Sequence, residues 1–330
     1  MDRRQLLTLA VGGGVTLLAG CGRPPQAVSS TGPAVAQLGD TVQAANPMVT
    51  AERYFADQAA ALTRGRYRVD VRPGGTLGDD NRVTEMVRTG QVAFAKTPMG
   101  NLTAYDKRLG VLGLPYAFGG EQQCLSMLDG ELGRRCTSIL SESGLAVLAY
   151  FYGGDRNLYN AKRPIHEPAD LKGLRIRVPQ DIVSIDMINA MGGSAVPMAT
   201  NDLLSALQQH VVDGAEDSAV FYVTERNVQR ARYYSRSRHQ QSIDVLIGSW
   251  KWLSEQPQDM QDAILVAGRH TQAEEIRLWD EASATALAAA KSQGALVNDV
   301  DIAAFQQAVA SVVDEHRGTF GDLAALLPGG

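Results

Sequence analysis

The sequence has few cysteines, few aromatic residues and no excess of positive charge. Its 330 residues include three cysteines and 6% aromatic residues, and the formal net charge is -5. A chain of this length can bury a substantial core without disulfides. Because acidic and basic residues are interspersed, we expect no nucleic-acid partner. Heptads, low-complexity tracts and internal repeats are also missing from the sequence, which argues against a coiled coil or a repeat protein.

The motifs of common enzymes are missing as well. The sequence has no P-loop and no nucleophile elbow. The histidines are scattered, without the spacing of a metal site: His166, His210, His239, His270 and His316. Paired carboxylates stand at Asp79-Asp80 and Glu216-Asp217, and the first pair is placed to favour a helix start. We therefore predict a protein that is not an enzyme, that uses no cofactor and that has no metal-ligating residues; the sequence leaves open whether ligand binding depends on a metal ion.

The N-terminal stretch MDRRQLLTLAVGGGVTLLAGCG has the pattern of an export signal. An arginine pair precedes a short apolar run that glycines interrupt, so the run is too short for a spanning helix. Leu18-Ala19-Gly20-Cys21 resembles the bacterial lipobox, in which the cysteine is lipidated and becomes the first mature residue. We expect a lipoprotein signal peptide over residues 1–20 and a membrane anchor at Cys21. Ordinary signal cleavage is the alternative, and the arginine pair leaves Sec and twin-arginine export both open.

Residues 21–33 are rich in Pro, Ser, Gly and Ala and are expected to form a flexible tether that holds a folded domain off the membrane. Export would place the remaining two cysteines, Cys124 and Cys136, in an oxidising compartment. Gly130 and Gly133 lie between them and offer a turn. The spacing leaves a disulfide open, because sequence alone does not supply the required geometry.

Helical and alternating patterns take turns along the rest of the chain. Strands are expected over 34–38, 66–73, 92–95, 145–153, 174–178, 195–197, from 210 and near 296. Helices are expected over 47–63, 77–90, around 121–142, and over 181–191, 201–209 and 301–316. A further helical pattern runs from about 258 to 293, long enough to cross two lobes. This order predicts two α/β lobes with a cleft between them, where ligands of such folds bind.

The stretch LKGLRIRVPQ places two arginines side by side on one predicted strand. Leu174, Ile176 and Val178 alternate with Arg175 and Arg177, so the arginines share the face opposite the apolar residues. A solvated face would explain them. The alternative is that one arginine projects into the cleft, where a guanidinium binds a carboxylate through two hydrogen bonds with a directionality that lysine lacks.

Several motifs in order resemble the solute-binding proteins of TRAP transporters, the DctP family. PADLKGLRIRVPQ, MINAMGGSAVPM and LLSALQQHVVDGAED are similar to the family's P-x-DLKGLKIRVP, GA-x-PVPM and ALQQGVVDGQEN patterns. TLGDDNRVTEMVRTG, LGLPYAFGG, YYSRSRH and GSWKWLSEQPQDMQDAI resemble further family segments over most of the mature chain. The resemblance implies a two-lobed fold that closes on a small organic anion, braced by a long helix across both lobes.

The resemblance also implies roles for particular residues. The arginine before Val-Pro, here Arg177, would grip the ligand carboxylate. A second family arginine, in a G-x-R segment, corresponds to Arg156 in GGDR, with Arg163 in AKRP as a rival. The residue after the DG-x-E run is often an asparagine that contacts the ligand. Asp217 stands there in this chain, so it would either pair with an arginine or accept hydrogen bonds from ligand hydroxyl or ammonium groups.

Three further positions are expected to line the cleft. Thr200 stands where the family often has an aromatic residue, and the change would leave more room in the cleft or line it differently. In the first lobe, Asp80 and Thr97 are the expected lining residues. For Asp80 this role competes with a place at the start of a helix.

The expected function is capture of a small organic carboxylate and its delivery to a TRAP permease, from the periplasm or the outer face of the cytoplasmic membrane. Lobe I is expected to comprise residues 34–153 and about 243–282, and lobe II residues 154–242 and about 283–330. A ligand-sensing receptor of the same fold and a periplasmic enzyme acting on a carboxylate are the alternatives. Genes for permease subunits beside this one would favour transport.

Overall fold

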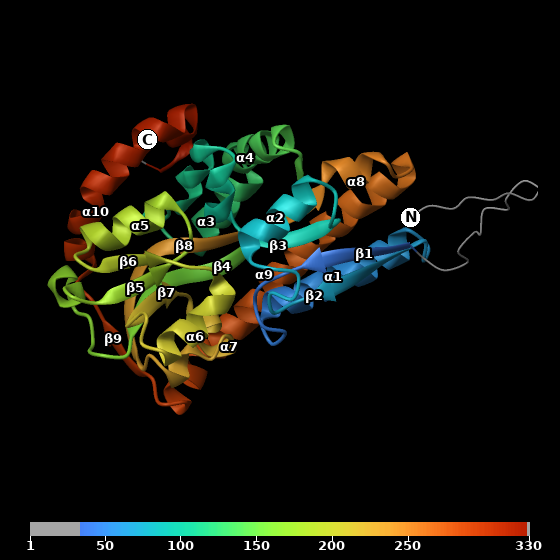
Figure 1. Cartoon of the computed structure of the whole chain (residues 1–330). Coiled ribbons are helices and arrows are strands. Elements are labelled where there is room, and N and C mark those ends of the chain that lie inside the picture. Colours follow the sequence, from blue (N-terminus) through green and yellow to red (C-terminus); the bar gives the residue numbers. More distant parts are fainter. Residues whose placement is uncertain (1–33, 329–330) are drawn as a thin grey trace, which may run out of the picture. The chain divides into compact units, whose positions relative to one another are not determined.

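The computed structural model describes residues 34–328, whose arrangement is shown in Figure 1. The predicted signal peptide, the tether and the lipidation site at Cys21 lie outside the described residues. Within the described range, no helix combines the length and the apolar character needed to cross a membrane.

The strands form one mixed sheet with helices packed on its faces. The strands are β1 (Ala34–Gly39), β2 (Tyr67–Arg72), β3 (Phe94–Pro98), β4 (Leu145–Asn160), β5 (Arg175–Val178), β6 (Ser194–Pro197), β7 (Gly214–Asp217), β8 (Tyr233–Ser249) and β9 (Leu296–Asp299). Their order in the sheet is β2-β1-β3-β8-β4-β7-β5-β6, and β9 pairs with β8. The pairs β1–β2, β1–β3, β5–β6 and β5–β7 are parallel, as the alternation of helices and strands predicts.

The α-helices alternate with these strands. They are α1 (Pro47–Leu62), α2 (Asp80–Arg88), α3 (Glu121–Asp129), α4 (Glu131–Glu142), α5 (Ile182–Ala190), α6 (Leu203–Gln208), α7 (Ala219–Thr224), α8 (Trp250–Ser254), α9 (Gln258–Ser292) and α10 (Ile302–Arg317). Short 3-10 helices include η1 (Met99–Ala104), η2 (Lys107–Gly113), η4 (Thr200–Asp202) and η6 (Gly318–Leu326). Side-chain caps start several of the helices, for example Asp79 on α2 and Asp181 on α5.

Two long antiparallel strands join the halves of the fold. β4 and β8 pair from Leu145–Ser249 at one end to Asn160–Tyr233 at the other. On one side of this pair lie β1, β2 and β3, and on the other lie β5, β6 and β7. One cluster of buried apolar residues contains Phe55 and Phe94 and extends to Phe221 of α7, while two smaller clusters contain Tyr159 and Ile176 of the other half. The molecule is therefore an α/β protein with two lobes on one shared sheet.

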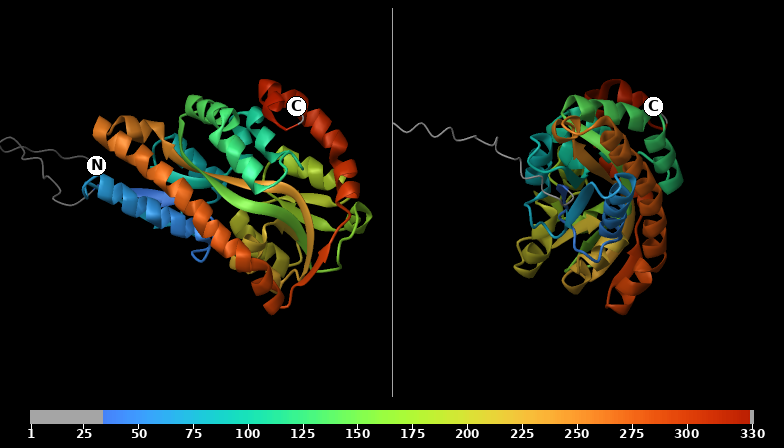
Figure 2. Two further views of the ribbon diagram at one scale, coloured as in Figure 1. Left: turned by 180° about the vertical axis from the view of Figure 1, so that it is seen from behind. Right: turned by 90° about the vertical axis from the view of Figure 1, so that its right-hand side faces the viewer.

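The long helix α9 braces both lobes. It begins directly after Pro257 and runs for 35 residues, about 50 Å at 1.5 Å per residue. It packs against α1 and β4 in the first lobe and against α7 in the second, and Figure 2 shows it running along the side of the molecule. Gly268 allows the close approach, because a Cβ atom there would lie 2.4 Å from the carbonyl oxygen of Leu148. The predicted bracing helix is confirmed in position and length.

β4 bends where it passes from one lobe to the other. Its register against β8 shifts between Tyr152 and Asp155, around a Gly153-Gly154 pair. Gly154 has φ +80°, a conformation that side chains disfavour, and a Cβ atom on Gly153 would lie 2.7 Å from Ser242. The two glycines thus bring β4 close to β8 immediately before Arg156.

The two described cysteines are not paired. Cys124 in α3 and Cys136 in α4 are free and buried. Burial raises the pKa of both thiols to about 12, so neither is a reactive thiolate at neutral pH. The disulfide that the sequence left open is therefore not formed in this structure.

Candidate functional site

The two arginines of β5 lie on the same face of the strand in different surroundings. Ile176 and Val178 point into the core, as the alternation predicts. Arg175 is exposed. Its Nε donates to Asp213 Oδ2 at 3.0 Å, and its Nη2 donates to the His210 carbonyl at 2.6 Å. Arg177 is buried, with 2% of its surface exposed. Arg175 therefore fits the solvated-face interpretation, whereas the side chain of Arg177 is buried inside the protein.

Arg177 is held by neutral groups alone. Its Nε donates to the Met198 carbonyl at 2.9 Å, and its Nη2 donates to Thr200 Oγ1 at 3.2 Å. Among residues 34–328, no carboxylate oxygen lies within 4.0 Å of the guanidinium. Burial lowers the pKa of Arg177, while Glu216 and Asp217 nearby act in the opposite direction. A buried cation without a paired anion is costly unless an anion joins it.

Arg156, on β4, is by contrast paired with a carboxylate. Its Nε and Nη2 bind the two carboxylate oxygens of Glu216, and Nη2 also donates to the Glu216 carbonyl at 2.9 Å. His239 Nε2 lies 3.3 Å from Glu216 Oε2, and His239 Nδ1 lies 2.8 Å from Ser237 Oγ. Burial alone would raise the pKa of Glu216, but Arg156 and His239 together hold it at about 2. The Glu216 carboxylate therefore fixes the plane of Arg156 and leaves Nη1 for other partners.

Asp217 lies beside this ion pair. Its Oδ1 accepts from the Ser218 amide at 2.8 Å and lies 3.4 Å from Arg156 Nη1. Burial raises the pKa of Asp217 to about 6, although Arg156 acts to lower it. The carboxylate has only a long contact with an arginine, so it keeps acceptor capacity for another group.

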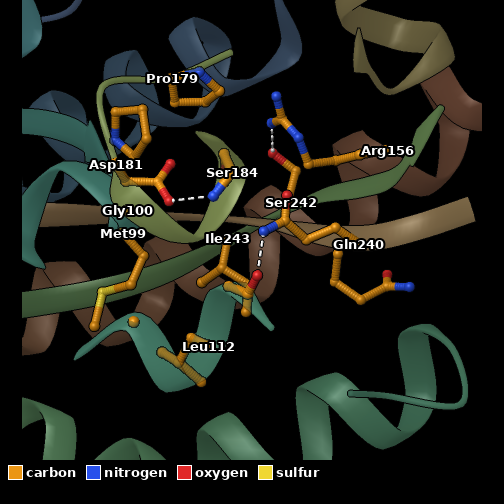
Figure 3. A pocket seen from close by; sticks show the side chains of 14 residues that line it. Met99, Gly100, Leu112, Arg156, Pro179, Asp181, Ser184, Gln240, Ser242 and Ile243 are labelled. Carbon is orange, nitrogen blue, oxygen red and sulfur yellow. Dashed lines mark hydrogen bonds between the residues drawn. The ribbon is translucent and has the colours of Figure 1, made fainter. Parts of the chain in front are cut away.

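A cavity opens next to Arg156. Its walls come from η1 and η2 in the first lobe, from residues 179–184 in the second, and from residues 240–243 of β8 between them. Figure 3 shows Arg156 donating to Ser242 Oγ on one side of the cavity. Asp181 lies on another side, where it accepts from Ser184. Arg177, Asp217 and Thr200 do not line this cavity. Asp217 lies beside it, with Oδ1 3.4 Å from Nη1 of the cavity-lining Arg156.

The rim of the cleft is closed by contacts between the lobes. Asn81 Nδ2 donates to Gln180 Oε1 at 2.9 Å, and the Gln43 amide donates to Glu225 Oε1 at 3.0 Å. Burial raises the pKa of Glu225 to about 7. The structure therefore has the lobes in contact, as expected of a closed state.

The two first-lobe candidates make no hydrogen bond or ion pair with Arg156 or Arg177. Asp80, in the first turn of α2, accepts from Thr41 Oγ1 at 2.8 Å, and burial raises its pKa to about 6. Thr97, in β3, is buried, and its hydroxyl has no partner among the described residues. Neither residue lines the cavity. The position of Asp80 at the start of a helix is as the sequence predicts, and contact of Asp80 or Thr97 with a ligand stays a prediction.

Between the two rival arginines, the geometry favours Arg156. Arg163 donates to the backbone carbonyls of Asp170 at 3.0 Å and Lys172 at 2.6 Å, away from the cavity. Sequence reasoning assigned no role to Glu216 or His239, which hold Arg156 in place. The Glu216-Asp217 pair was visible in the sequence, but its partner depends on the pairing of β4 with β7. Within residues 34–328, no group of His, Cys, Asp and Glu side chains is arranged to hold a metal ion.

Comparison with known proteins identifies the family. Residues 38–318 match the model of the bacterial extracellular solute-binding proteins of family 7, DctP. A solute-binding protein of Chromohalobacter salexigens is 32% identical over 277 residues, which cover 83% of this chain and 82% of that protein.

Solved structures of TRAP periplasmic solute-binding proteins share the fold. One from Sulfitobacter sp. NAS-14.1, with bound β-D-galacturonate, is 27% identical, with a TM-score of 0.87 over 90% of this chain and 100% of that chain. One from Chromohalobacter salexigens, with bound D-glucuronate, is 30% identical, with a TM-score of 0.85 over 88% of this chain and 97% of that chain. The chain belongs to the DctP family, the extracytoplasmic solute-binding proteins of TRAP transporters.

Proposed function

We propose that this chain captures a sugar acid of the uronate type and delivers it to a TRAP permease. The observation that carries the proposal is Arg177, a buried guanidinium whose partners within residues 34–328 are a carbonyl and a hydroxyl. A ligand carboxylate would supply the missing anion. The proteins of similar structure that hold galacturonate and glucuronate support a polyhydroxylated acid as its carrier.

The remaining candidates take supporting roles in this proposal. Thr200 positions the Arg177 guanidinium through its hydroxyl. Arg156, held by Glu216, adds positive charge beside the site, and its Nη1 is the atom directed away from that ion pair. Asp217 accepts hydrogen bonds from ligand hydroxyl groups, which suits a sugar acid better than a plain dicarboxylate. Asp80 and Thr97 contact the part of the ligand that faces lobe I.

A thermal-shift screen of organic acids tests the proposal, because a ligand that binds only the native state raises its melting temperature. The panel would contain D-glucuronate, D-galacturonate, aldonates, C4 dicarboxylates and the uncharged parent sugars. We expect the sugar acids to raise the melting temperature and the parent sugars to leave it unchanged. An equal response to galactose and galacturonate would show that the carboxylate is not what the site recognises.

We also propose that Cys21 is lipidated and that residues 21–33 tether the domain to the outer face of the cytoplasmic membrane. The lipobox pattern and the Pro- and Ser-rich stretch that follows support this arrangement. Cys21→Ser should shift the protein from the membrane fraction to the soluble periplasmic fraction. A wild-type protein already found in the soluble fraction would contradict the anchor.

The lobe boundaries proposed from the sequence divide at residues 153 and 242, close to the bend in β4. Spin labels on cysteines introduced at the exposed positions Asp57 and Gln208 would report the distance between lobes. The native Cys124 and Cys136 are buried and should stay unlabelled. The distance should shorten when the ligand is added, and an unchanged distance would contradict lobe closure.

A further inference from the structure

Asp181 is a buried carboxylate that faces the cavity from lobe II. It follows β5 directly and caps α5, since its Oδ1 accepts from the Ser184 amide at 2.8 Å. Only 6% of its surface is exposed, and both Asp181 and Ser184 line the cavity beside Arg156. Burial raises the pKa of Asp181, while hydrogen bonds from Ser184 lower it. The capping bond occupies one oxygen of the carboxylate.

The second oxygen points across the cleft. A Cβ atom placed on Gly100, in η1 of lobe I, would lie 2.9 Å from Asp181 Oδ2. Within residues 34–328, no lysine, arginine or histidine nitrogen lies within 4.0 Å of the Asp181 carboxylate. Oδ2 has no hydrogen-bond partner among the described residues and keeps some exposure. It is therefore an acceptor that a ligand in the cavity can reach.

The other polar groups of the cavity indicate which donor fits. Ser242 Oγ accepts from Arg156 Nη1 at 3.1 Å, so its own hydrogen can be donated to a ligand. Gln240 uses its amide nitrogen on the Gly113 carbonyl and keeps its carbonyl oxygen as an acceptor. Arg156 is close enough to lower the pKa of Asp181 and would repel a ligand ammonium. Hydroxyl groups, which both donate and accept, match this lining.

We propose that Asp181 is a specificity residue that reads a hydroxyl group of the bound sugar acid and excludes a second carboxylate. In the closed protein, Oδ2 accepts from that hydroxyl, while Gly100 allows η1 to approach the carboxylate closely. A dicarboxylate would instead bring a second negative charge against Asp181. The inference rests on the proposed function, because it assumes that the ligand carboxylate is bound elsewhere, at Arg177.

Asp181→Asn is the sharpest variant. Asparagine caps helices as well as aspartate does, so α5 keeps its start. The neutral side-chain amide of asparagine would remove the negative charge now at Oδ2 and would place an NH2 donor or an uncharged carbonyl oxygen there. Asp301→Asn is the matched control, since Asp301 caps α10 in the same way, through Oδ1 and the Ala304 amide, and does not line the cavity.

Gly100→Ala approaches the same contact from lobe I. Gly100 does not have a positive φ, so alanine is allowed by the backbone. Its methyl group would lie 2.9 Å from Asp181 Oδ2 when the lobes are closed and would push the carboxylate aside. This variant keeps the Asp181 side chain itself, and its melting temperature without ligand reports any effect on the α5 cap and on folding.

Calorimetric titration of the mature domain with D-glucuronate, D-galacturonate, succinate and adipate tests the inference. For the wild type, we expect the tighter uronate to bind at least tenfold better than either dicarboxylate. Asp181→Asn and Gly100→Ala should each weaken uronate binding at least tenfold. Asp181→Asn should leave dicarboxylate binding unchanged or stronger, and Asp301→Asn should match the wild type throughout.

Two results would overturn the inference alone. One is uronate affinity within twofold of the wild type in Asp181→Asn, and the other is an equal loss of uronate and dicarboxylate affinity in that variant. A wild-type protein that binds none of these acids would overturn the proposed function and this inference with it. The wild-type titration therefore distinguishes the two failures.

Discussion

Arg177→Met should abolish tight ligand binding without destabilising the empty protein. The variant removes a buried charge that has no paired anion among the described residues, and holding such a charge in the interior is costly. It also removes the hydrogen bonds to the Met198 carbonyl and Thr200 Oγ1, each worth about 1 kcal/mol. The two effects oppose each other. We expect the free energy of unfolding of the empty variant to stay within about 1 kcal/mol of wild type.

The loss of binding should be large. A charge-assisted, two-bond contact between guanidinium and carboxylate contributes about 1.5–3 kcal/mol. The dissociation constant of Arg177→Met should therefore rise roughly tenfold to hundredfold. Isothermal titration calorimetry with the acid that gives the largest thermal shift measures this change.

Arg156→Met is the matched comparison, and its stability should change in the opposite sense. Arg156 is paired with Glu216, so its removal leaves a buried carboxylate without its cation. Breaking a buried pair in this way costs about 3–5 kcal/mol, which lowers the melting temperature by roughly 6–20 °C. Thermal denaturation of the two variants without ligand compares them directly. If Arg177→Met melts as low as Arg156→Met, or binds the acid as wild type does, the reasoning about Arg177 is refuted.

Three further predictions concern pH and packing. The pKa of Glu216 is lowered to about 2, so its ion pair contributes stability above about pH 4.5 that is lost as the pH falls towards 2. Between pH 5 and pH 3, the melting temperature should therefore fall less in Glu216→Gln than in the wild type. The pKa of Asp217 is raised to about 6, so its protonation removes negative charge near the bound anion. Calorimetry should therefore show tighter ligand binding at pH 5 than at pH 7.5. If Asp217→Asn keeps this pH dependence of affinity, Asp217 is not its cause. Gly268→Ala should cost about 1–3 kcal/mol in chemical denaturation, because its methyl group would meet the Leu148 backbone, whereas Gly318→Ala, with open space around it, should be close to neutral.

Elements with a strong local pattern were predictable from the sequence. The helical pattern over about 258–293 has Gly268 as its one glycine or proline before Gly294, and the structure has α9 over Gln258–Ser292. The alternation around β5 placed Ile176 and Val178 in the core correctly. It could not decide which arginine is buried, because Arg175 and Arg177 share a face. The difference comes from the tertiary partners Asp213 and Met198.

The long central strands were predicted incompletely for a physical reason. The expected strand over 145–153 ends at the Gly153-Gly154 pair, which reads as a turn, yet β4 continues through a bulge to Asn160. No strand was predicted over β8, because its middle is polar. Its buried residues Ser235, Ser237 and His239 find hydrogen-bond partners in other elements or in the strand itself. Polar side chains satisfied in this way do not show the apolar alternation by which strands are recognised.

Part of the candidate site could be found only in three dimensions. Arg177, Arg156 and Asp217 were identified from strand alternation and family resemblance. Glu216 gains its role from the register that sets Asn157 opposite Asp217 and brings Arg156 to its side. Asp181 reads in the sequence as an ordinary helix cap, and only the approach of Gly100 from the other lobe shows that it faces a cavity.

The most direct test is a crystal structure of the mature domain with the acid that the thermal-shift screen selects. The account predicts that the ligand carboxylate lies within hydrogen-bond distance of the Arg177 guanidinium, beside Thr200 and Arg156. A carboxylate bound elsewhere, with Arg177 still held only by the Met198 carbonyl and Thr200, would contradict it.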